Sequence, residues 1–486
     1  MKMLTNPIEE GIQELLTQIN SKLTIAKLEK IPQSGSDRQY FRVLANNGNS
    51  YIATYSLNTA ENETFLHFTS HFKAAHLPVP KVYAINESKT LYLQEDFGNQ
   101  SLLDVLEVNG KTSDSYLLFQ KSLAALAAMQ IKGGEGFNYD DCITAKAFGK
   151  QAMMNDLLYF KYYFLDTLHI PYDKEALLND FDTLSTTLAN AEHQHFMFRD
   201  FQSRNIMVKN NEVHFIDYQG GMKGALQYDV ASLLWQAKAQ LSQEWKDCLL
   251  QYYIAQVESL LGKSINRPSF ENEYNGFVLI RLLQVLGAYG FRGLFERKAH
   301  FLTSIPLALK SIQYFMASKQ LSINMPVFTQ LLQQISSDAI IHQFTPTQAN
   351  EYTALVIEVS SFSYLKNGIP TSTNDTGGGF VFDMRGILNP GRFDDYKKLS
   401  GKDKPVQDFL DQKTLMNRFL NSAWDLLDVS IENYLARNFE HLSISFGCTG
   451  GQHRSVFAAE QTARHLRNKY KVKVILKHIN EADWVR

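Results

Sequence analysis

The chain has 486 residues, of which 44% are hydrophobic and 20% are charged, enough to bury more than one hydrophobic core. Its formal net charge of -2 excludes a general electrostatic attraction to nucleic acid or to anionic membranes. The cysteines Cys142, Cys248 and Cys448 lie far apart, which excludes a disulfide framework and favours a reducing cytoplasm.

Residues 1–95 are expected to form a small β-rich lobe. The first residues lack the apolar segment of a signal peptide, and alternating runs over 23–57 predict β-hairpins. Within these runs, the Ser/Gly turn at 34–38 could place backbone N–H groups around an anion, and Arg38 or Arg42 could add positive charge. The alternative for Arg38 is an ordinary hairpin turn with an exposed arginine.

Downstream, the pattern becomes mostly helical. Apolar spacing predicts a helix over 61–75, which the prolines within 77–80 end. Helices then dominate from 102 to 319, interrupted by short strands. The longest apolar stretch, 277–291, contains Arg281 and is too short to span a bilayer, so we expect a buried helix there.

The most informative motif begins at Phe198. Asp200 and Asn205 are five residues apart, and Asp217 ends a short apolar strand. Phosphoryl transfer from a nucleotide needs this set, because one carboxylate orients and deprotonates the attacking hydroxyl while an amide oxygen and a second carboxylate hold magnesium. We therefore expect Asp200 to be the base and Asn205 and Asp217 to hold Mg²⁺. Asp229, in the first turn of the next helix, could accept backbone N–H groups there.

These residues resemble a known family. The strings RDFQSRN, FIDYQ and YDVASLL are similar to those of the aminoglycoside- and choline-kinase-like branch of the protein-kinase fold. Within that branch, the chain most resembles the anomeric amino-sugar kinases of bacterial cell-wall recycling, which phosphorylate N-acetylmuramate and N-acetylglucosamine. Three further segments carry this resemblance: SGSDRQYFRV at 34–43, LQEDFG at 93–98 with SLL at 101–103, and RLLQVLG at 281–287.

The resemblance implies an α+β, protein-kinase-like domain over 1–320. Its N-lobe would cover 1–95, its hinge 94–99 and its C-lobe 100–320. ATP would be the co-substrate. The implied nucleotide-binding residues are Ser34, Gly35, Ser36, Asp37, Arg38, Gln94, Glu95 and Asp96.

The chain departs from the family pattern at two places. Phe198 replaces the histidine of many relatives, a position that usually serves packing rather than proton transfer. The strand at 50–56 lacks the lysine with which most kinases hold the phosphates. Glu63 could be the helix carboxylate that kinases use to organise the phosphate site. With no partner lysine, a solvated helix face or a pair with an arginine is the alternative.

A second domain is expected over 351–486, after a linker over 321–350. Its pattern alternates apolar strands with helices, which predicts a smaller, open α/β domain. The expected strands are 355–359, 379–383, 442–446 and 472–476, and the expected helices are 406–434 and 453–470.

The chemistry of this domain is concentrated at one strand-to-helix turn, GCTGGQHRS at 447–455. Small residues let the backbone curl with its N–H groups inward, and the following helix adds its positive end. With His453 and Arg454 in the first turn, the segment is a candidate site for a phosphate or carboxylate. Cys448 and Arg454 also have the Cys-x5-Arg spacing of tyrosine-phosphatase-like loops, in which a thiolate attacks phosphorus.

The strings around this turn resemble the C-terminal domain of RapZ proteins over nearly its whole length. They are EVSSFSYLKNGIP at 358–370, VFDMRGILNP at 381–390, LSGKDKPV at 399–406 and GCTGGQHRSVFAAE at 447–460. RapZ proteins bind glucosamine-6-phosphate and small regulatory RNA through this domain, so the resemblance implies ligand contacts from Thr449, Gly450, His453 and Arg454. Asn367 stands where many relatives have histidine. RapZ proteins also have an N-terminal P-loop domain, which is replaced here by the kinase-like domain. RNA binding therefore does not follow from the resemblance, and a small RNA is left as a possible partner.

The sequence thus predicts a cytoplasmic, ATP- and Mg²⁺-dependent kinase for a sugar hydroxyl, with a C-terminal domain that binds a phosphorylated amino sugar and no membrane partner. The expected acceptor is the anomeric hydroxyl of N-acetylmuramate or N-acetylglucosamine. Two alternatives stay open. One is a non-catalytic amino-sugar sensor or RNA-binding adaptor of the RapZ type. The other is a kinase for a different hydroxyl substrate, such as an amino alcohol or an aminoglycoside.

Overall fold

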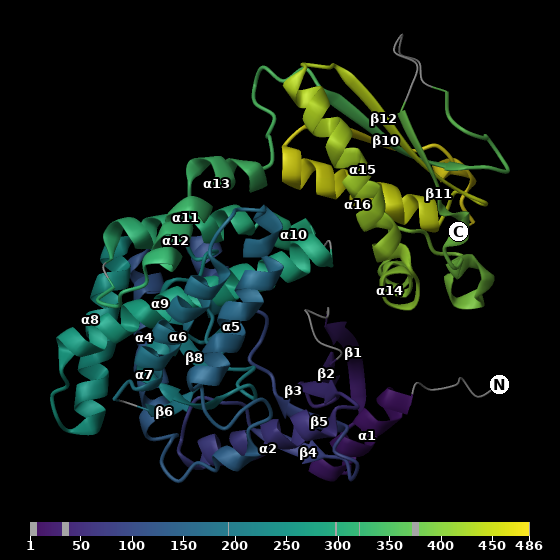
Figure 1. Cartoon of the computed structure of the whole chain (residues 1–486). Helices are drawn as coiled ribbons and strands as arrows, with labels where there is room; N and C mark the ends of the chain where they lie inside the picture. The colour runs from purple at the N-terminus through teal and green to yellow at the C-terminus, as the bar shows by residue number, and fades with distance from the viewer. Residues whose placement is uncertain are drawn as a thin grey trace. The chain divides into compact units, whose positions relative to one another are not determined.

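The computed structural model describes residues 7–31, 38–192, 194–296, 299–319, 321–371 and 379–485. The chain divides into two compact units (Figure 1). The first comprises Met1–Gly290 and Leu307–Ser337, and the second comprises Phe291–Pro306 and Asp338–Arg486. Helices α12, Pro326–Ile335, and α13, Asp338–Phe344, occupy the predicted linker.

The first unit begins with helix α1, Pro7–Ile19, and an antiparallel sheet. Its strands, in spatial order, are β1 Ile25–Ile31, β2 Gln39–Ala45, β3 Ser50–Tyr55, β5 Leu91–Glu95 and β4 Val82–Ile85. Successive side chains of a strand point to opposite faces, so Leu93 packs in the core with Leu15 and Leu16 of α1, whereas Tyr92 stacks on Phe65 of helix α2. This helix, Thr59–Ala74, starts at Asn58, whose side chain accepts the backbone N–H of Glu61.

The rest of the first unit is mostly helical. It also contains two antiparallel two-stranded sheets, β6 with β9 and β7 with β8. The loops that follow these strands carry the residues of the catalytic motif. The elements are α3 Leu102–Asn109, α4 Ser113–Ile131, α5 Lys150–Tyr163, α6 Lys174–Ala189, β6 Gln194–Met197, β7 Ile206–Lys209, β8 Glu212–Phe215, β9 Met222–Ala225, α7 Leu226–Leu234, α8 Gln243–Leu261, α9 Arg267–Tyr289 and most of α11 Ile305–Ser318. Helix α10, Ala299–Leu302, belongs to the second unit.

Helix α9 is the apolar helix expected around 277–291. Among the described residues, the segment Arg267–Phe295 is the one stretch that is long and apolar enough to cross a membrane. Of its apolar window, 61% is buried inside the protein, as expected for a core helix. Its Gly287 lets the backbone of α5 approach, because a Cβ there would lie 2.9 Å from backbone atoms of Phe160.

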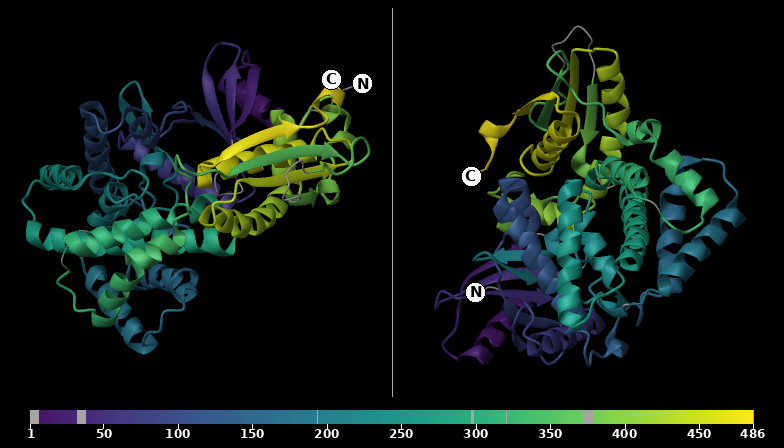
Figure 2. Two further views of the ribbon diagram at one scale, coloured as in Figure 1. Left: turned by 90° about the horizontal axis from the view of Figure 1, so that it is seen from above. Right: turned by 90° about the vertical axis from the view of Figure 1, so that its left-hand side faces the viewer.

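The second unit contains a four-stranded sheet in which every pair of neighbours is parallel. Its spatial order is β11 Gly379–Asp383, β12 His441–Cys448, β10 Val356–Ser363 and β13 Lys473–His478, and the strands run side by side in Figure 2. Helices α14 Lys404–Lys413, α15 Met416–Ala436 and α16 Arg454–Tyr470 accompany the sheet. The predicted α/β class of this domain is confirmed.

The long helical region predicted over 406–434 is present as two helices, because the chain breaks between α14 and α15. Thr414 has an extended backbone, with φ -137° and ψ 173°. Its hydroxyl donates to the carbonyl of Leu410 at 2.5 Å and accepts the N–H of Met416 at 3.1 Å. A threonine hydroxyl can satisfy helix-end groups in this way, so one residue ends one helix and starts the next.

Candidate functional site

Asp200, Asn205 and Asp217 come together in the first unit. Asp200 follows β6, Asn205 lies in the short helical turn before β7, and Asp217 follows β8. The amide nitrogen of Asn205 donates to the backbone carbonyl of Asp200 at 2.9 Å. It also lies 3.4 Å from a carboxylate oxygen of Asp200 and 3.4 Å from one of Asp217. One amide therefore holds both carboxylates at the same place.

The carboxylate of Asp200 is surrounded by positive charge. Arg281 of α9 donates to it at 3.2 Å and Arg204 at 3.3 Å, and the Gln202 amide donates as well. The Arg281 side chain is only 7% exposed, whereas that of Arg204 is 57% exposed. Enclosure by protein alone would raise the pKa of Asp200, but Arg281 and Arg204 outweigh it and hold the pKa below its ordinary value. Asp200 is thus kept ionised.

Asp217 has the opposite electrostatic setting. Its side chain is open to solvent on one side, yet protein surrounds it closely enough to raise the pKa of its carboxyl, and the nearby charge of Asp200 adds to this effect. Gln219 donates to it at 2.9 Å. A cation between these acids would relieve the repulsion.

The donor set fits a hard cation. Amide and carboxylate oxygens are the ligands that Mg²⁺ accepts in nucleotide enzymes, where phosphates and waters complete the coordination. In the described ranges, no group of three or more His, Cys, Asp or Glu side chains forms a metal site. A magnesium here would depend on Asn205, Asp217 and oxygens that a substrate brings.

Asp229 of α7 fixes the backbone of the loop that carries Asp200. Its two carboxylate oxygens accept the backbone N–H groups of Phe198, at 2.7 Å, and Arg199, at 2.9 Å. Gln130 donates to it at 3.0 Å. The prediction that Asp229 caps its own helix was wrong, because α7 packs this side chain against the loop. Burial raises the pKa of Asp229 to about 7, and the three N–H donors oppose that rise.

Two neighbours of Asp200 complete the loop. Arg199 has φ +76°, and its Nη2 donates to both carboxylate oxygens of Asp156, at 2.8 Å each. Phe198 is fully buried and packs against the rings of Phe201, Phe215 and Tyr218. This agrees with a packing role for the position that is histidine in many relatives.

Arg38 is buried, so the interpretation of an exposed turn arginine was wrong. It is 4% exposed, and it pairs with Glu61 of α2 at 3.3 Å. Glu63, the predicted helix carboxylate, instead forms a surface pair with Lys89 at 2.6 Å. The carboxylate of α2 that pairs with an arginine is thus Glu61, one half-turn earlier, whereas Glu63 lies on a solvated helix face. The predicted nucleotide residues Ser34, Gly35, Ser36 and Asp37 lie outside the described residues.

The polar side chains of the predicted hinge are hydrogen-bonded to neighbouring residues of the same lobe. The carboxylate of Asp96 accepts from Arg42 at 2.7 Å, from Ser50 at 2.6 Å and from the N–H of Gly98 at 2.9 Å. Gln94 donates to Thr54 at 3.3 Å, and Glu95 accepts the N–H of Lys81 at 3.2 Å. A nucleotide at this hinge would therefore use the backbone.

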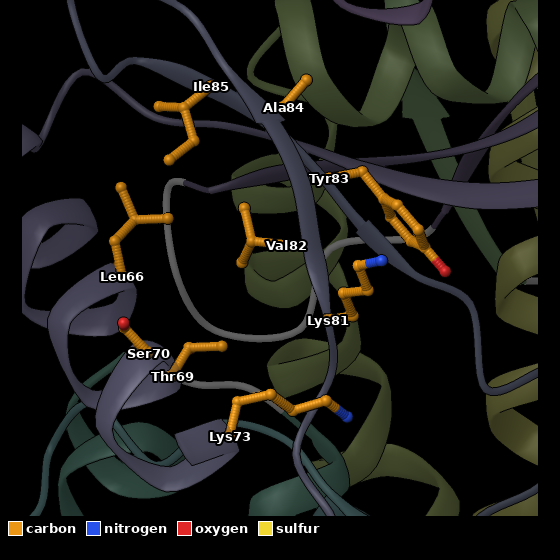
Figure 3. Close-up of a pocket in the computed structure, with 9 residues that line it drawn as sticks. All are labelled: Leu66, Thr69, Ser70, Lys73, Lys81, Val82, Tyr83, Ala84 and Ile85. Carbon is orange, nitrogen blue, oxygen red and sulfur yellow. The ribbon is translucent and has the colours of Figure 1, made fainter. Parts of the chain in front are cut away.

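Pockets lined by described residues include two in the first unit. A narrow one beside Asp200 is lined by Gln202, Arg281, Tyr289 and Trp235, among others. The larger one, of 590 Å³, lies between α2 and β4 and contains none of the predicted site residues (Figure 3). One of its lining residues, Thr69, shares a 2.5 Å hydrogen bond with Tyr218, next to Asp217. The narrow pocket is the candidate acceptor site, because it includes groups that touch Asp200.

The second candidate site lies at the carboxyl edge of the parallel sheet, where such sheets bind ligands. Strand β12 ends at Cys448, the turn holds Thr449 and Gly450, and α16 begins at Arg454. Thr449 and Gly450 are exposed, whereas Arg454 is 4% exposed. One nitrogen of Arg454 donates to the carbonyls of Met384, Arg385 and Ile387 at 2.8 to 3.3 Å, and another donates to Thr449 at 3.4 Å.

His453 and Asn367 are held in place around this turn. The ring of His453 bonds the carbonyl of Tyr396 at 2.9 Å, and burial lowers its pKa. The amide of Asn480 donates to Asn367 at 2.6 Å. The turn thus brings together Thr449, Gly450, His453 and Arg454, as the resemblance implied.

Cys448 is almost inaccessible. It is 2% exposed, and its Sγ accepts the N–H of Gly451 at 3.2 Å and lies 3.1 Å from the Ser455 hydroxyl. A phosphatase also needs an acid to protonate the leaving oxygen. Two aspartates of this unit, Asp383 and Asp394, are already paired, with Arg385 and Lys397.

Two exposed arginines near Arg454 were missed at the sequence level. Arg385 and Arg392 follow β11. Burial lowers the pKa of Arg454, and the charges of Arg392 and Arg385 add to the effect, so all three lie close enough to repel. The string at 381–390 pointed to this segment without indicating that it faces the turn.

Comparison with known proteins supports two regions. Residues 27–261 match the phosphotransferase enzyme family, and residues 355–480 match the RapZ C-terminal domain. A nucleotide-binding protein of Shewanella halifaxensis is 38% identical over 130 residues, which are 26% of this chain and 44% of that protein. The chain therefore spans less than half the length of this relative.

Solved structures resemble the chain weakly. A putative aminoglycoside phosphotransferase from Ralstonia eutropha has 14% identity and a TM-score of 0.46, with 64% of this chain and 99% of that chain covered. A choline/ethanolamine kinase family protein from Mesorhizobium loti has 11% identity and a TM-score of 0.45, with coverages of 69% and 99%. Similarity at this level adds nothing about the substrate.

Proposed function

Because this chain joins a kinase-like phosphotransferase domain to a RapZ C-terminal domain, we propose that it is a small-molecule kinase with a sugar-phosphate sensor. The proposed reaction transfers the γ-phosphoryl group of ATP to a sugar hydroxyl. The acceptor that the sequence resemblance favours is the anomeric hydroxyl of N-acetylmuramate or N-acetylglucosamine. The observation that carries the proposal is the meeting of Asp200 and Asp217 at the amide of Asn205.

Each group in this constellation has a defined task. Asp200, kept ionised by Arg281, orients the acceptor hydroxyl and takes its proton as the bond to phosphorus forms. Arg204 is exposed beside Asp200, where its guanidinium can face the transferred phosphoryl group. Asn205 and Asp217 would hold Mg²⁺, which supplies charge neutralisation to the phosphates.

The rival interpretation is a non-catalytic adaptor. A scaffold has no physical need to bring an ionised carboxylate, an amide and a repelled second carboxylate to one place. The absence of a lysine on β3 is the main support for the adaptor. In this proposal the buried Arg38 of the same lobe takes the place of that lysine.

The test is turnover of ATP with a panel of amino sugars, amino alcohols and aminoglycosides, with the product identified by phosphorus NMR. We expect a sugar 1-phosphate. Asp200→Asn should lower kcat by roughly 10²- to 10⁴-fold, as loss of a general base does. Asp140→Asn, which alters a surface pair with Lys146, is the control and should be silent. Equal turnover by Asp200→Asn would disprove the role of Asp200, and no turnover with any acceptor would favour the adaptor.

For the second unit, we propose a binding site for a phosphorylated amino sugar rather than a phosphatase centre. Buried Arg454 keeps its Nε without a hydrogen-bond partner, the turn exposes Thr449 and Gly450, and a helix begins there. Arg392 adds positive charge that a phosphate would relieve, whereas Arg385 is paired with Asp383. Buried Cys448 has no open path to phosphorus.

Calorimetric titration of the full chain with glucosamine-6-phosphate tests this site. Binding should vanish in Arg454→Ala and survive in Cys448→Ser. Phosphate release that disappears with Cys448→Ser would show that the turn is a phosphatase loop. A gel-shift with small structured RNA over a salt series tests the adaptor role separately.

A further inference from the structure

We infer that Glu61 organises the nucleotide-phosphate site by two links, one to Arg38 and one through Gln219 to Asp217. Arg38 then supplies the phosphate-facing cation that strand β3 lacks. The inference rests on the proposed kinase function and adds to it a positioning carboxylate and a bridge between the two lobes that the motif did not contain.

The contacts form a continuous chain. Arg38 Nη2 lies 3.3 Å from Glu61 Oε1. The same oxygen accepts from Gln219 Nε2 at 3.3 Å, and Gln219 Nε2 also donates to Asp217 at 2.9 Å. From Asp217 the chain continues through Asn205 to Asp200. A carboxylate at the start of α2 is therefore connected to every residue of the proposed catalytic set.

Arg38 occupies the position of a missing charge. Kinases place a lysine on the third strand, paired with a helix carboxylate, to hold the phosphates. On the α2-facing side, β3 carries Ser50, Ile52 and Thr54, none of which is charged, and Thr54 is buried opposite Tyr40 in the sheet. Arg38 lies two residues before Tyr40, and since alternate residues share a face, it points to the same side. The long side chain of Arg38 can therefore bring its guanidinium to the phosphates that a β3 lysine would otherwise hold.

The charge on Arg38 is secure. Burial alone would lower its pKa, but Tyr92, Tyr40 and Glu61 outweigh burial and raise it. Glu61 and Gln219 link the guanidinium of Arg38 to Asp217, the proposed metal ligand. The charge of Arg38 therefore acts on the region where the nucleotide phosphates and Mg²⁺ would sit.

The start of α2 is fixed well enough for Glu61 to serve both partners. Asn58 caps the helix by accepting the N–H of Glu61 at 3.3 Å. Asn62 donates to the carbonyls of Ser56 at 3.1 Å and Lys89 at 2.8 Å, which pins the first turn to the sheet. Glu63, on the same helix, faces Lys89 at the surface and provides a matched control.

The test is equilibrium binding of ATP with Mg²⁺ to the full chain, in parallel with ADP and adenosine. We expect Arg38→Met to weaken ATP binding by about 10-fold or more and adenosine binding little, because a buried charge-assisted contact to phosphate is lost. Arg38→Lys should restore part of the loss. Glu61→Gln should weaken ATP binding, and Arg38→Met/Glu61→Gln should be no worse than the worse single variant, because the pair acts as a unit. Glu63→Gln should bind like wild type.

The bridge through Gln219 has its own measurement. Gln219→Met keeps the side-chain length but cannot donate to Glu61 and Asp217, so the Mg²⁺ concentration for half-maximal ATP binding should rise several-fold. If wild type binds no nucleotide, the kinase proposal itself fails. If wild type binds ATP and both Arg38→Met and Glu61→Gln bind it equally well, this inference is wrong. If Arg38→Met does not fold, Arg38→Lys and Glu61→Gln decide the question.

Discussion

At the scale of single residues, the balance of charge around Asp200 decides what the site can do. Protein enclosure opposes ionisation of Asp200, and two arginines reverse the outcome. Arg281 is the stronger influence, because it is buried while Arg204 is largely solvated and screened. Burial and the charge of Asp200 raise the pKa of Asp217, so the pKa values of the two acids shift in opposite directions although they share one amide. Environments that push two acids apart in this way are typical of catalytic sites.

This balance predicts a pH effect. Because the pKa of folded Asp200 is depressed, the ionised base is available down to a pH below the ordinary aspartate value, and its ion pairs stabilise the fold until the pH falls through that depressed value. Arg281→Met removes the main opposing charge, so the acid limb of kcat/KM should move to higher pH. Arg204→Met should move it less. A pH–rate profile from 4 to 9 is the measurement, and an unmoved limb in Arg281→Met would contradict the assignment.

At the scale of elements, helix α7 determines the shape of the catalytic loop. One buried carboxylate, Asp229, satisfies two consecutive backbone N–H groups that would otherwise be buried without partners. Helix α16 plays a similar part in the second unit, where its first residues pack so closely on the 399–406 segment that Gly401 has no room for a Cβ. In both cases an element far along the chain shapes a loop.

Asp229→Asn tests the anchor in the first unit. The single oxygen of the asparagine side chain can accept only one of the two backbone N–H groups. The backbone N–H groups of Phe198 and Arg199 should therefore exchange faster, as if the loop were destabilised by about 1–3 kcal/mol. We also expect kcat to fall. Hydrogen exchange by mass spectrometry measures the first effect. Asp180→Asn is the matched control, because Asp180 is a buried acid that accepts a backbone N–H, that of Phe328, away from the catalytic loop.

Gly401→Ala tests the seat of α16. The added Cβ would lie 2.3 Å from the carbonyl oxygen of His453 and 2.4 Å from the nitrogen of Phe457. Backbone atoms cannot yield cheaply, so we expect the turn to lose roughly 2 kcal/mol of local stability and to bind glucosamine-6-phosphate more weakly. Gly386→Ala is the control, because a Cβ there meets nothing within 4 Å. Unchanged binding in Gly401→Ala would show that the seat does not shape the site.

At the scale of the whole molecule, the two units have separate hydrophobic clusters and separate sites. The described partners of Asp200 all belong to the first unit, and those of Arg454 all belong to the second. The three cysteines are free.

This separation predicts additivity. In the absence of a sugar phosphate, Arg454→Ala should leave kcat and KM of the kinase reaction within about 2-fold of wild type, since sites without shared partners rarely couple by more than about 0.5 kcal/mol. Asp200→Asn should bind glucosamine-6-phosphate normally. If glucosamine-6-phosphate changes the turnover of wild type but not that of Arg454→Ala, the ligand regulates the kinase, and the units are coupled through binding.

The sequence by itself determined the chemistry that depends on local order. The spacing of Asp200, Asn205 and Asp217 around short strands identified the kinase-like unit, and alternation of strands and helices identified the α/β unit. The domain boundaries at 320 and 350 and the roles of these residues stay predictions. Only the tertiary structure decided which distant residues meet: Arg38 with Glu61 rather than a lysine with Glu63, and Asp229 with the loop at Phe198 rather than with its own helix. The break between α14 and α15 likewise depends on the hydrogen bonds that the Thr414 hydroxyl makes to the backbone of Leu410 and Met416. The physical reason is that spacing along a chain fixes periodicity, whereas a buried charge takes the nearest opposite charge or donor that packing brings to it.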